Sequence, residues 1–476
     1  PISLLGFPFV EYHYPAVLST RDFTYAVKSQ KDQRSSNNMS SKHKLFEGAM
    51  ILTAAGFASR IMGFFFRIFL SHAFGEENVG LYQLVFPVYA LCLALSTSGI
   101  QTAVSHMTAE KTALKKNTEA RSILGTALGL TLLISFAEIL FVQKNASFIA
   151  ISFLGDERCT DLLMIISYAL PCAAIHSCIC GYYLGLQKTG LPAVSQLIEQ
   201  AVRILSVLLL FVITQNSGRT PSIHLAAAGI AAGEFVSALF AAHSLSRYGG
   251  LIQAFSPKDL GKNLRELLGL SVPLTSNRTV VTLLQSIEAA SIPVCLRLYG
   301  LDTSEALSLY GVLTGMALPC IQFPSAVTNS VGTVLMPAVS ATSTTGNRAA
   351  VIRLLKKAVG SCFILGLSCC LFFLVFGRLI GALLFRSDTA GNFIITLAWI
   401  CPFLYTNTSL FSAINGYGKT GYTFLINTFG LLIRLGSVFF VIPQFGIQGY
   451  LWGLLISQLS VSALALAVLL FRAAKE

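Results

Sequence analysis

The chain has few charged residues, and what it lacks excludes a soluble fold. Charged residues make up only 11% of its 476 residues, against roughly 25% in a soluble domain. Hydrophobic residues make up 54%. A soluble protein of this length needs far more polar surface, so most of this chain must face lipid. Its apolar residues form long runs rather than short alternating segments, which disfavours a transmembrane β-barrel.

The sequence also lacks the usual marks of a metal site, a disulfide framework or an active site. Its 11 cysteines include no CxxC pair and no His/Cys cluster with zinc spacing. Most lie inside apolar runs, where a thiol packs as a small apolar group. No Ser/His/Asp set or pair of carboxylates is visible either. We therefore expect no metal, no cofactor and no enzyme.

Long apolar runs account for most of what is present. Each is about 20 residues or more, the length that crosses a bilayer core as a helix. The sequence predicts an all-α integral membrane protein with about twelve transmembrane helices. We expect them at residues 46–71, 80–106, 121–142, 161–185, 192–213, 224–246, 265–296, 306–340, 355–376, 391–415, 421–442 and 447–471. Proline inside several of them predicts kinks, at Pro87, Pro171, Pro273, Pro319 and Pro324.

The net charge of +12 is a signal of topology. Basic residues gather in the leader, the even-numbered connections and the tail, whereas the odd-numbered connections hold several acids. By the positive-inside rule both termini are cytoplasmic, and a role in binding nucleic acid is disfavoured. Residues 1–44 read as a polar, disordered leader, of which we expect 1–38 to lie outside the functional unit.

An internal repeat divides the rest of the chain. The turn Gly185-Leu-Gln-Lys-Thr-Gly190 returns as Gly416-Tyr-Gly-Lys-Thr-Gly421, and Arg203 with Ser206 returns as Arg434 with Ser437. The glycines 229 and 233 have counterparts at 449 and 453. The pattern predicts two six-helix lobes, at 45–250 and 265–476, joined by a cytoplasmic linker at 251–264. Parallel repeats of this kind are related by a pseudo-twofold axis along the membrane normal, and we expect a central cavity between them.

Ionisable side chains deep in a bilayer are costly and usually functional. The candidates for a cationic binding site are Arg60, Arg67, Arg203, Arg278 and Arg434. Arginine pairs well with phosphate because its planar fork donates two parallel hydrogen bonds. For Arg67, snorkelling to the outer interface is an equal alternative. Helical spacing places further polar groups beside these arginines: Gln196, Glu199, Gln200, Gln285, Glu288, Asn329 and Asn427.

Other interpretations of the acidic residues stay open. Glu199 and Arg203 are four apart and could form an internal structural ion pair. Arg278 and Arg297 are the candidate partners of Glu288. We interpret His176 and Glu138 as structural residues whose polar atoms are satisfied.

The motif Ser59-Arg60-Ile-Met-Gly63-Phe-Phe-Phe-Arg67, followed by Phe74-Gly75 and Gly80-Leu-Tyr82, resembles the opening of the stage V sporulation protein B group. That group belongs to the polysaccharide and peptidoglycan-precursor flippases of the multidrug/oligosaccharidyl-lipid/polysaccharide exporter superfamily. The stretches 309–340 and 416–421 are similar to its eighth helix and its tenth connection. The resemblance covers the chain from Lys44 onward.

The resemblance implies a monomeric flippase in a bacterial plasma membrane. Its substrate would be an undecaprenyl-diphosphate-linked saccharide or peptidoglycan precursor, used in cell-wall, spore-cortex or polysaccharide synthesis, with the membrane lipids as its other partners. The coupling ion is left open. One alternative is a multidrug and toxin extrusion antiporter, which would depend on Glu199, Glu234 or Glu288. Another is a membrane scaffold for envelope assembly that transports nothing.

Overall fold

The computed structural model describes residues 35–247, 260–344 and 348–475, and within these ranges every regular element is helical. The first half contains α2 (Ser35–Leu93), α3 (Gly99–Ala113), α4 (Asn117–Phe148), α5 (Cys159–Ser167), α6 (Ala169–Gly185), α7 (Gly190–Asn216), α8 (His224–Arg247) and α9 (Leu260–Tyr299). The second contains α10 (Thr303–Gly311), α11 (Leu318–Gln322), α12 (Ser325–Thr344), α13 (Arg348–Ile380), α14 (Asp388–Ala398), α15 (Cys401–Gly416), α16 (Thr420–Gly436), α17 (Ile442–Phe445) and α18 (Ile447–Lys475). Short π-helical stretches interrupt several spans, among them η2 (Ala94–Ser98), η5 (Val312–Ala317) and η7 (Ser437–Val441).

The twelve predicted segments all lie in helical regions, although several are divided between consecutive helices: 161–185 covers α5 and α6, 306–340 covers α10 to α12, and 391–415 covers α14 and α15. In the described residues ten helices are long and apolar enough to cross a membrane, and an eleventh span forms if α14 and α15, which meet at 55°, count as one. The first of the ten, Met50–Ala113, holds two predicted segments. These meet at Gly75, whose φ of 79° and ψ of 171° break the helix inside α2. The protein is therefore an all-α, multi-pass membrane protein.

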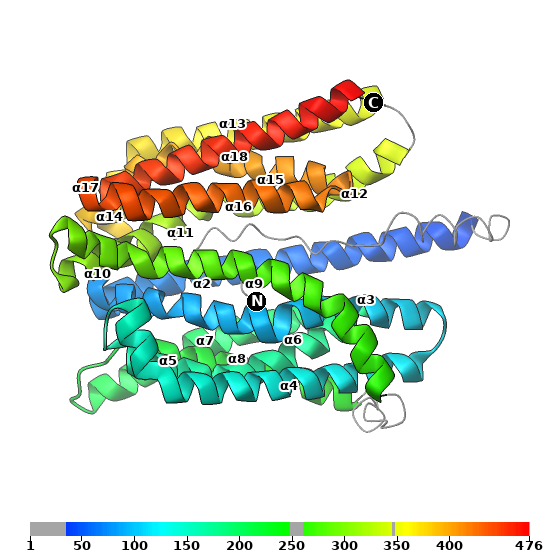
Figure 1. Cartoon of the computed structure of the whole chain (residues 1–476), viewed down its shortest axis with the longest axis horizontal. Coiled ribbons are helices and arrows are strands. Elements are labelled where there is room, and N and C mark those ends of the chain that lie inside the picture. Colours follow the sequence, from blue (N-terminus) through cyan, green and yellow to red (C-terminus); the bar gives the residue numbers. More distant parts are fainter. Residues whose placement is uncertain (1–34, 248–259, 345–347, 476) are drawn as a thin grey trace.

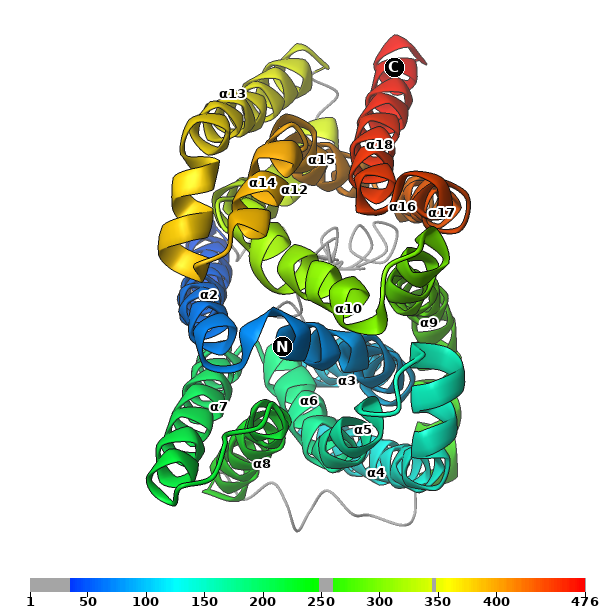
Figure 2. The ribbon, with the colours of Figure 1, turned by 90° about the vertical axis from the view of Figure 1, so that its left-hand side faces the viewer.

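The helices lie roughly parallel to one another in two groups (Figure 1). One group is built from α3 to α8 and the other from α12 to α18. Viewed along the helices, α2, α9 and α10 lie between the two groups (Figure 2). Most of the leader, residues 1–34, and most of the predicted linker, residues 248–259, lie outside the described residues. Residues 35–44, predicted as disordered, form the first turns of α2.

The internal repeat has the same backbone geometry in both halves. The three amides after Gly185 bond to the carbonyls of Tyr182, Leu184 and Tyr183, and those after Gly416 bond to Ala413, Asn415 and Ile414. These acceptors are 231 positions apart, as are Gly185 and Gly416. Both turns are left-handed at one residue, Gln187 at φ 59° and Gly418 at φ 72°. This hydrogen-bond pattern is a Schellman C-cap.

Packing follows the same spacing of 231 residues. A Cβ added to Gly185 would lie 2.5 Å from the carbonyl oxygen of Ser105, and one added to Gly416 would lie 2.7 Å from that of Met336. The two halves also meet at one equivalent pair, Gly80 and Gly311. A Cβ on Gly311 would lie 2.6 Å from the Gly80 nitrogen, and one on Gly80 would lie 3.3 Å from the Gly311 nitrogen. The pseudo-twofold axis therefore passes between these two glycines.

The predicted pairing of the later glycines is wrong by one helical turn. Gly229 on α8 packs against Arg203 and Ser206, whereas Gly453 on α18 packs against Ser437, the counterpart of Ser206. Gly233 approaches the Glu199 carbonyl, and its counterpart is Ser457, which donates to the Gly430 carbonyl at 2.8 Å. Residues of the sixth and twelfth segments thus correspond at a spacing of 224 positions, seven fewer than the 231 that relates the earlier parts of the repeat. The prediction was wrong because Gly449 and Gly453 are four residues apart, as Gly229 and Gly233 are, so the equal spacing hid a shift of one turn.

A charged clamp ties together two connections at one end of the bundle. Arg158 donates to both carboxylate oxygens of Asp156, at 3.0 and 2.8 Å, and to Glu77 at 2.7 Å. Burial would raise the pKa of the Asp156 carboxyl, but the hydrogen bonds from Arg158 outweigh it and hold that pKa below its ordinary value. All three residues belong to odd-numbered connections.

Candidate functional site

The five candidate arginines come from four helices and differ in burial. Arg60 and Arg67 lie on the first part of α2, Arg203 on α7, Arg278 on α9 and Arg434 on α16. Arg203 and Arg434 are buried, with 8% and 4% of their surface exposed, and the other three are half-buried. Guanidinium groups at this depth need charged or polar neighbours, because lipid offers none.

The polar stripe predicted on α7 exists and faces the interior. Glu199, Gln200 and Arg203 are buried, and Gln196 at the start of the stripe is half-buried. Arg203 Nη2 donates to Glu199 Oε1 at 2.5 Å, so the ion pair that we left as an alternative forms in the structure. The positive charge of Arg203 is therefore balanced by a carboxylate on the same helix.

The second buried ion pair joins Arg434 and Glu288. Their atoms Nη2 and Oε2 are 2.9 Å apart, and both side chains are at most 5% exposed. Tyr450 on α18 donates to the other oxygen of Glu288 at 2.8 Å. Both predicted partners of Glu288, Arg278 and Arg297, are therefore wrong. The reason is tertiary: α16 lies beside α9, while Arg297 reaches the Gly155 carbonyl at 3.0 Å.

Arg67 donates to a backbone carbonyl, that of Thr314, across 3.2 Å. Thr314 lies in the π-helical stretch η5, where a widened turn rearranges the carbonyls that an α-helix would bond internally. Arg67 also lies close enough to Tyr82 and Arg203 to interact with them electrostatically. The side chain thus joins the two halves of the bundle, which we had not predicted.

The remaining predicted polar groups are distributed over α9, α12 and α16. Gln285 is buried one turn before Glu288, and Thr282 donates to the Arg278 carbonyl at 2.9 Å. Asn329 is half-buried on α12. Asn427 is buried on α16, two turns before Arg434, and its Nδ2 has no hydrogen-bond partner among the described residues.

Glu138 corrects one interpretation of the sequence. We took it as a satisfied structural residue, but neither carboxylate oxygen has a hydrogen-bond partner in the part of the chain that the structure describes. It lies near Ser96 in η2. An i, i+4 hydrogen bond holds the Ser96 hydroxyl to the Cys92 carbonyl at 2.9 Å, so that hydroxyl's hydrogen is already donated.

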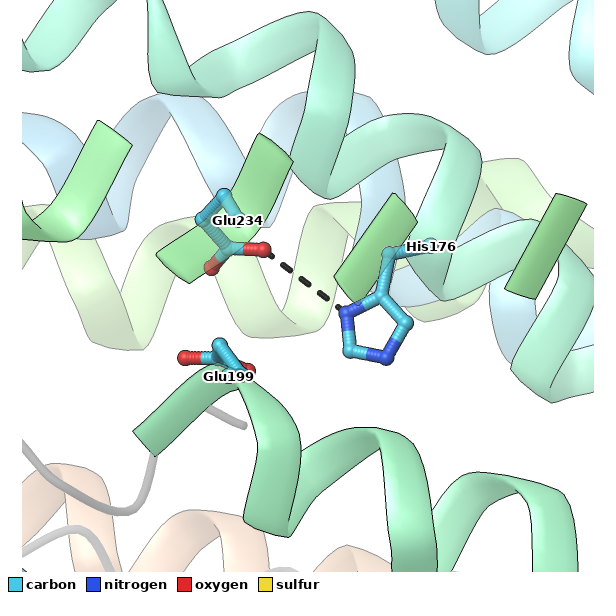
Figure 3. Close-up of side chains that lie close together, drawn as sticks. All are labelled: His176, Glu199 and Glu234. Carbon is cyan, nitrogen blue, oxygen red and sulfur yellow. Dashed lines mark ion pairs between the residues drawn. The ribbon is translucent and has the colours of Figure 1, made fainter. Parts of the chain in front are cut away.

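A polar cluster that the sequence did not predict lies between α6, α7 and α8. His176, Glu199 and Glu234 each place a nitrogen or oxygen atom within 4.8 Å of the other two (Figure 3). Ser195 lies 2.9 Å from the His176 ring, which gives a Ser-His-Glu series. Ser195 is fully buried and donates to the Pro192 carbonyl, so no acyl substrate reaches it. Periodicity along one helix cannot reveal such a cluster, because each helix contributes only part of it.

Comparisons with known proteins agree with this fold. The family model "Polysaccharide biosynthesis protein" matches residues 45–343. Stage V sporulation protein B of Bacillus subtilis (strain 168) is 29% identical over 418 residues, which cover 86% of this chain and 80% of that protein.

Two solved structures share the fold. The inward closed conformation of the lipid II flippase MurJ superposes with a TM-score of 0.70 at 16% identity, over 88% of this chain and 87% of that one. An inward-facing multidrug resistance MATE family transporter of the MOP superfamily gives 0.69 at 16% identity, over 88% and 95%. These neighbours are transporters rather than catalysts. The family model covers more than half of the sequence, and the chain belongs to the polysaccharide biosynthesis protein family.

Proposed function

We propose that the protein is a flippase that moves an undecaprenyl-diphosphate-linked saccharide or peptidoglycan precursor across the bacterial plasma membrane. It would act by alternating access, in cell-wall, spore-cortex or polysaccharide synthesis. The observation that carries the proposal is the presence of arginines at membrane depth in both halves of a transporter fold. A cation is costly in lipid, and an anionic headgroup between the lobes would offset that cost. The similarity to a sporulation protein and to a lipid II flippase supports the same substrate class.

Ion pairs with glutamates hold two of the arginines in this conformation. The charges of Arg203 and Arg434 are balanced by Glu199 and Glu288 in this conformation. We assign binding of the diphosphate to the five predicted arginines, because each planar fork can bind two phosphate oxygens: Arg60, Arg67, Arg203, Arg278 and Arg434. Arg203 and Arg434 would join only if lobe movement separates them from their glutamates. Gln196, Gln200, Gln285, Asn329 and Asn427 are the supporting polar groups.

The transport cycle would move residues 45–250 against residues 265–476 as two lobes. Both termini would face the cytoplasm, as the distribution of basic residues indicates. The lipid tail would stay in the bilayer while the charged head crosses between the lobes. We expect the monomer to suffice.

Leaflet exchange of a fluorescent undecaprenyl-diphosphate saccharide in proteoliposomes tests the proposal. We expect exchange with the wild type and at least a tenfold loss with Arg60→Ala, which is about 1.4 kcal/mol of binding. Arg60→Lys should retain part of the activity, because it keeps the charge and loses the fork. Arg353→Ala, an exposed arginine on α13, is the matched control and should exchange normally. Equal rates in Arg60→Ala and the wild type would contradict the proposal.

The buried carboxylates favour a second candidate, an antiporter for small organic cations. Glu199 and Glu234 lie in one cluster, and such exporters need acids in the site. In that case proteoliposomes would accumulate ethidium in exchange for ions, Glu234→Gln would abolish this uptake, and Arg60→Ala would not. A scaffold that transports nothing would show neither activity and would tolerate loss of every buried arginine.

A further inference from the structure

His176 and Glu234, which form a cluster with Glu199, have no part in the proposed binding of the diphosphate. The three side chains point toward one another from three helices (Figure 3). Their residues are only 2%, 1% and 4% exposed. His176 Nδ1 lies 3.7 Å from Glu234 Oε2, the ion pair drawn in Figure 3. Ionisable groups buried this deeply in a membrane bundle need a reason to be there.

The hydrogen-bonding groups around His176 can accommodate a ring that carries two protons. Ser195 Oγ donates to the Pro192 carbonyl at 3.2 Å and lies 2.9 Å from Nε2. Ser237 Oγ donates to the Glu234 carbonyl at 3.0 Å and lies 3.4 Å from Nδ1. When a serine gives its one hydrogen to that carbonyl, its oxygen can accept from the ring. The site therefore suits an imidazolium, in which both ring nitrogens donate.

Charge balance favours one proton on this pair. Arg203 is paired with Glu199, so a single proton held between His176 and Glu234 makes these four groups neutral. Without that proton one negative charge would be left in a low-dielectric interior, at a cost of several kcal/mol. Other groups facing the cluster are Tyr89, which donates to Glu234 Oε1 at 3.3 Å, the thiol of Cys180, 3.5 Å from Ser195, and Cys172, close enough to Glu234 to interact electrostatically. Tyr82 and Arg67 lie close enough to Arg203 to interact with it in the same way.

A metal ion fits this site less well than a proton. Both ring nitrogens of His176 are engaged with serines, and a guanidinium occupies Glu199 Oε1. A divalent cation would lie beside that guanidinium and repel it. A proton needs no coordination sphere, only a base and a nearby acid.

The other half of the repeat holds an uncharged version of this pair. The counterpart of His176, 231 positions on, is Asn407, and the counterpart of Glu234, 224 positions on, is Gln458. Asn407 Nδ2 donates to Gln458 Oε1 at 2.9 Å, so the contact between the two helices is kept. Two amides meet this packing requirement without ionising. The ionisable pair in the first half therefore has a purpose other than packing.

We propose that His176 and Glu234, together with Glu199, form an exchangeable proton site that couples the first lobe to the proton gradient. On release, the Nδ1–H bond breaks, its electron pair stays on nitrogen, and water takes the proton. Glu234 then competes with Glu199 for Arg203, which loosens the contact of α7 with α8. The proposal needs no particular substrate, and its test uses none.

Solid-state NMR of the protein in lipid bilayers, with ¹⁵N-labelled histidine, reads the protonation of the ring directly. His176→Asn identifies the signal. We expect both nitrogens of His176 to be protonated at pH 7 in the wild type and one to lose its proton as the pH is raised. In Glu234→Gln the ring should be neutral at pH 7, because its counter-charge is gone. Glu138→Gln, which alters an acid of α4 outside the cluster whose carboxylate has no hydrogen-bond partner among the described residues, is the matched control and should leave the signal unchanged.

A neutral His176 in the wild type at pH 7, or a ring indifferent to Glu234→Gln, would overturn the proposal. A shift of both ring signals on adding zinc or sodium ions at constant pH would instead identify a metal site and overturn it too. The double variant His176→Asn/Glu234→Gln copies the Asn407–Gln458 pair and should therefore fold. Its thermal unfolding should depend on pH less steeply than that of the wild type between about 6 and 8, the range in which histidine titrates.

Discussion

Arg203 and Arg434 occupy equivalent positions of the repeat, but their buried charges are neutralised by acids in different places. Arg203 pairs with Glu199 four residues earlier on its own helix. At the corresponding place before Arg434 the chain has Gly430, so no acid is available on α16. Glu288 on α9 supplies it instead, with help from Tyr450. A pair that one helix makes internally thus becomes, in the second half, a bond between helices.

We predict that Glu288→Gln strongly destabilises the protein. It leaves Arg434 buried without a counter-charge, which costs about 3–5 kcal/mol. The double variant Glu288→Leu/Arg434→Met, which removes both charges, should recover most of that loss. Thermal unfolding in detergent micelles measures both, with the exposed Glu110→Gln as the control. A double variant no more stable than the single one would contradict this account of the pair.

The left-handed turn after α6 permits a substitution that stabilises. Gln187 has a φ of 59°, a conformation that costs a residue with a Cβ about 1–2 kcal/mol. Gly418 already occupies the equivalent place. We expect Gln187→Gly to raise the free energy of unfolding by about 1 kcal/mol and Gly418→Gln to lower it by a similar amount. The two variants are controls for each other in one thermal-unfolding series, and shifts of the same sign would refute the argument.

At the scale of the elements, contact between α7 and α8 depends on the absence of a side chain. A Cβ at Gly233 would lie 2.8 Å from the Glu199 carbonyl oxygen and 3.3 Å from the Arg203 Cβ. The close packing of α8 on α7 at Gly233 therefore joins the two helices at the turn that carries Glu199 and Arg203. It also brings Glu234 of α8 to His176.

We predict that Gly233→Ala costs about 1–3 kcal/mol, as overpacking usually does. Gly129→Ala on α4 is the control, because nothing lies within 4 Å of its added Cβ. It should gain up to about 1 kcal/mol from helix propensity. Denaturation of both variants in the same detergent decides the matter, and equal effects would show that the crossing tolerates a methyl group.

For the whole molecule, the contact of Gly80 with Gly311 joins the two halves on their symmetry axis. By the predicted topology it lies near the outer ends of the second and eighth predicted segments, which begin at residues 80 and 306. Movement of the lobes in alternating access must separate these glycines, because two helices this close cannot admit a substrate between them. The contact is therefore an outer gate in the proposed cycle.

We predict that Gly311→Val shifts the population toward states open at the outer end. Spin labels at Asn78 and Ser304, both exposed, should give a single short distance in the wild type and an added longer one in the variant. Gly300→Val, in a turn with nothing within 4 Å of an added Cβ, should leave the distance unchanged at some cost in stability. An unchanged distance in Gly311→Val would rule out the gate.

The sequence by itself determined the helices and the repeat, because both depend on short-range patterns. The length of an apolar run predicts a span. The turn at Gly185 recurs at Gly416, and Arg203 and Arg434 follow the two turns at the same distance. The tertiary structure alone decided which charges meet. His176 and Glu234 are far apart in the chain, as are Glu288 and Arg434, and no periodicity along a single helix can relate them. The polar stripe on α7 was visible beforehand because one helix makes all of it. The cluster around His176 was not visible, because three helices have to pack before its acids and base share a proton.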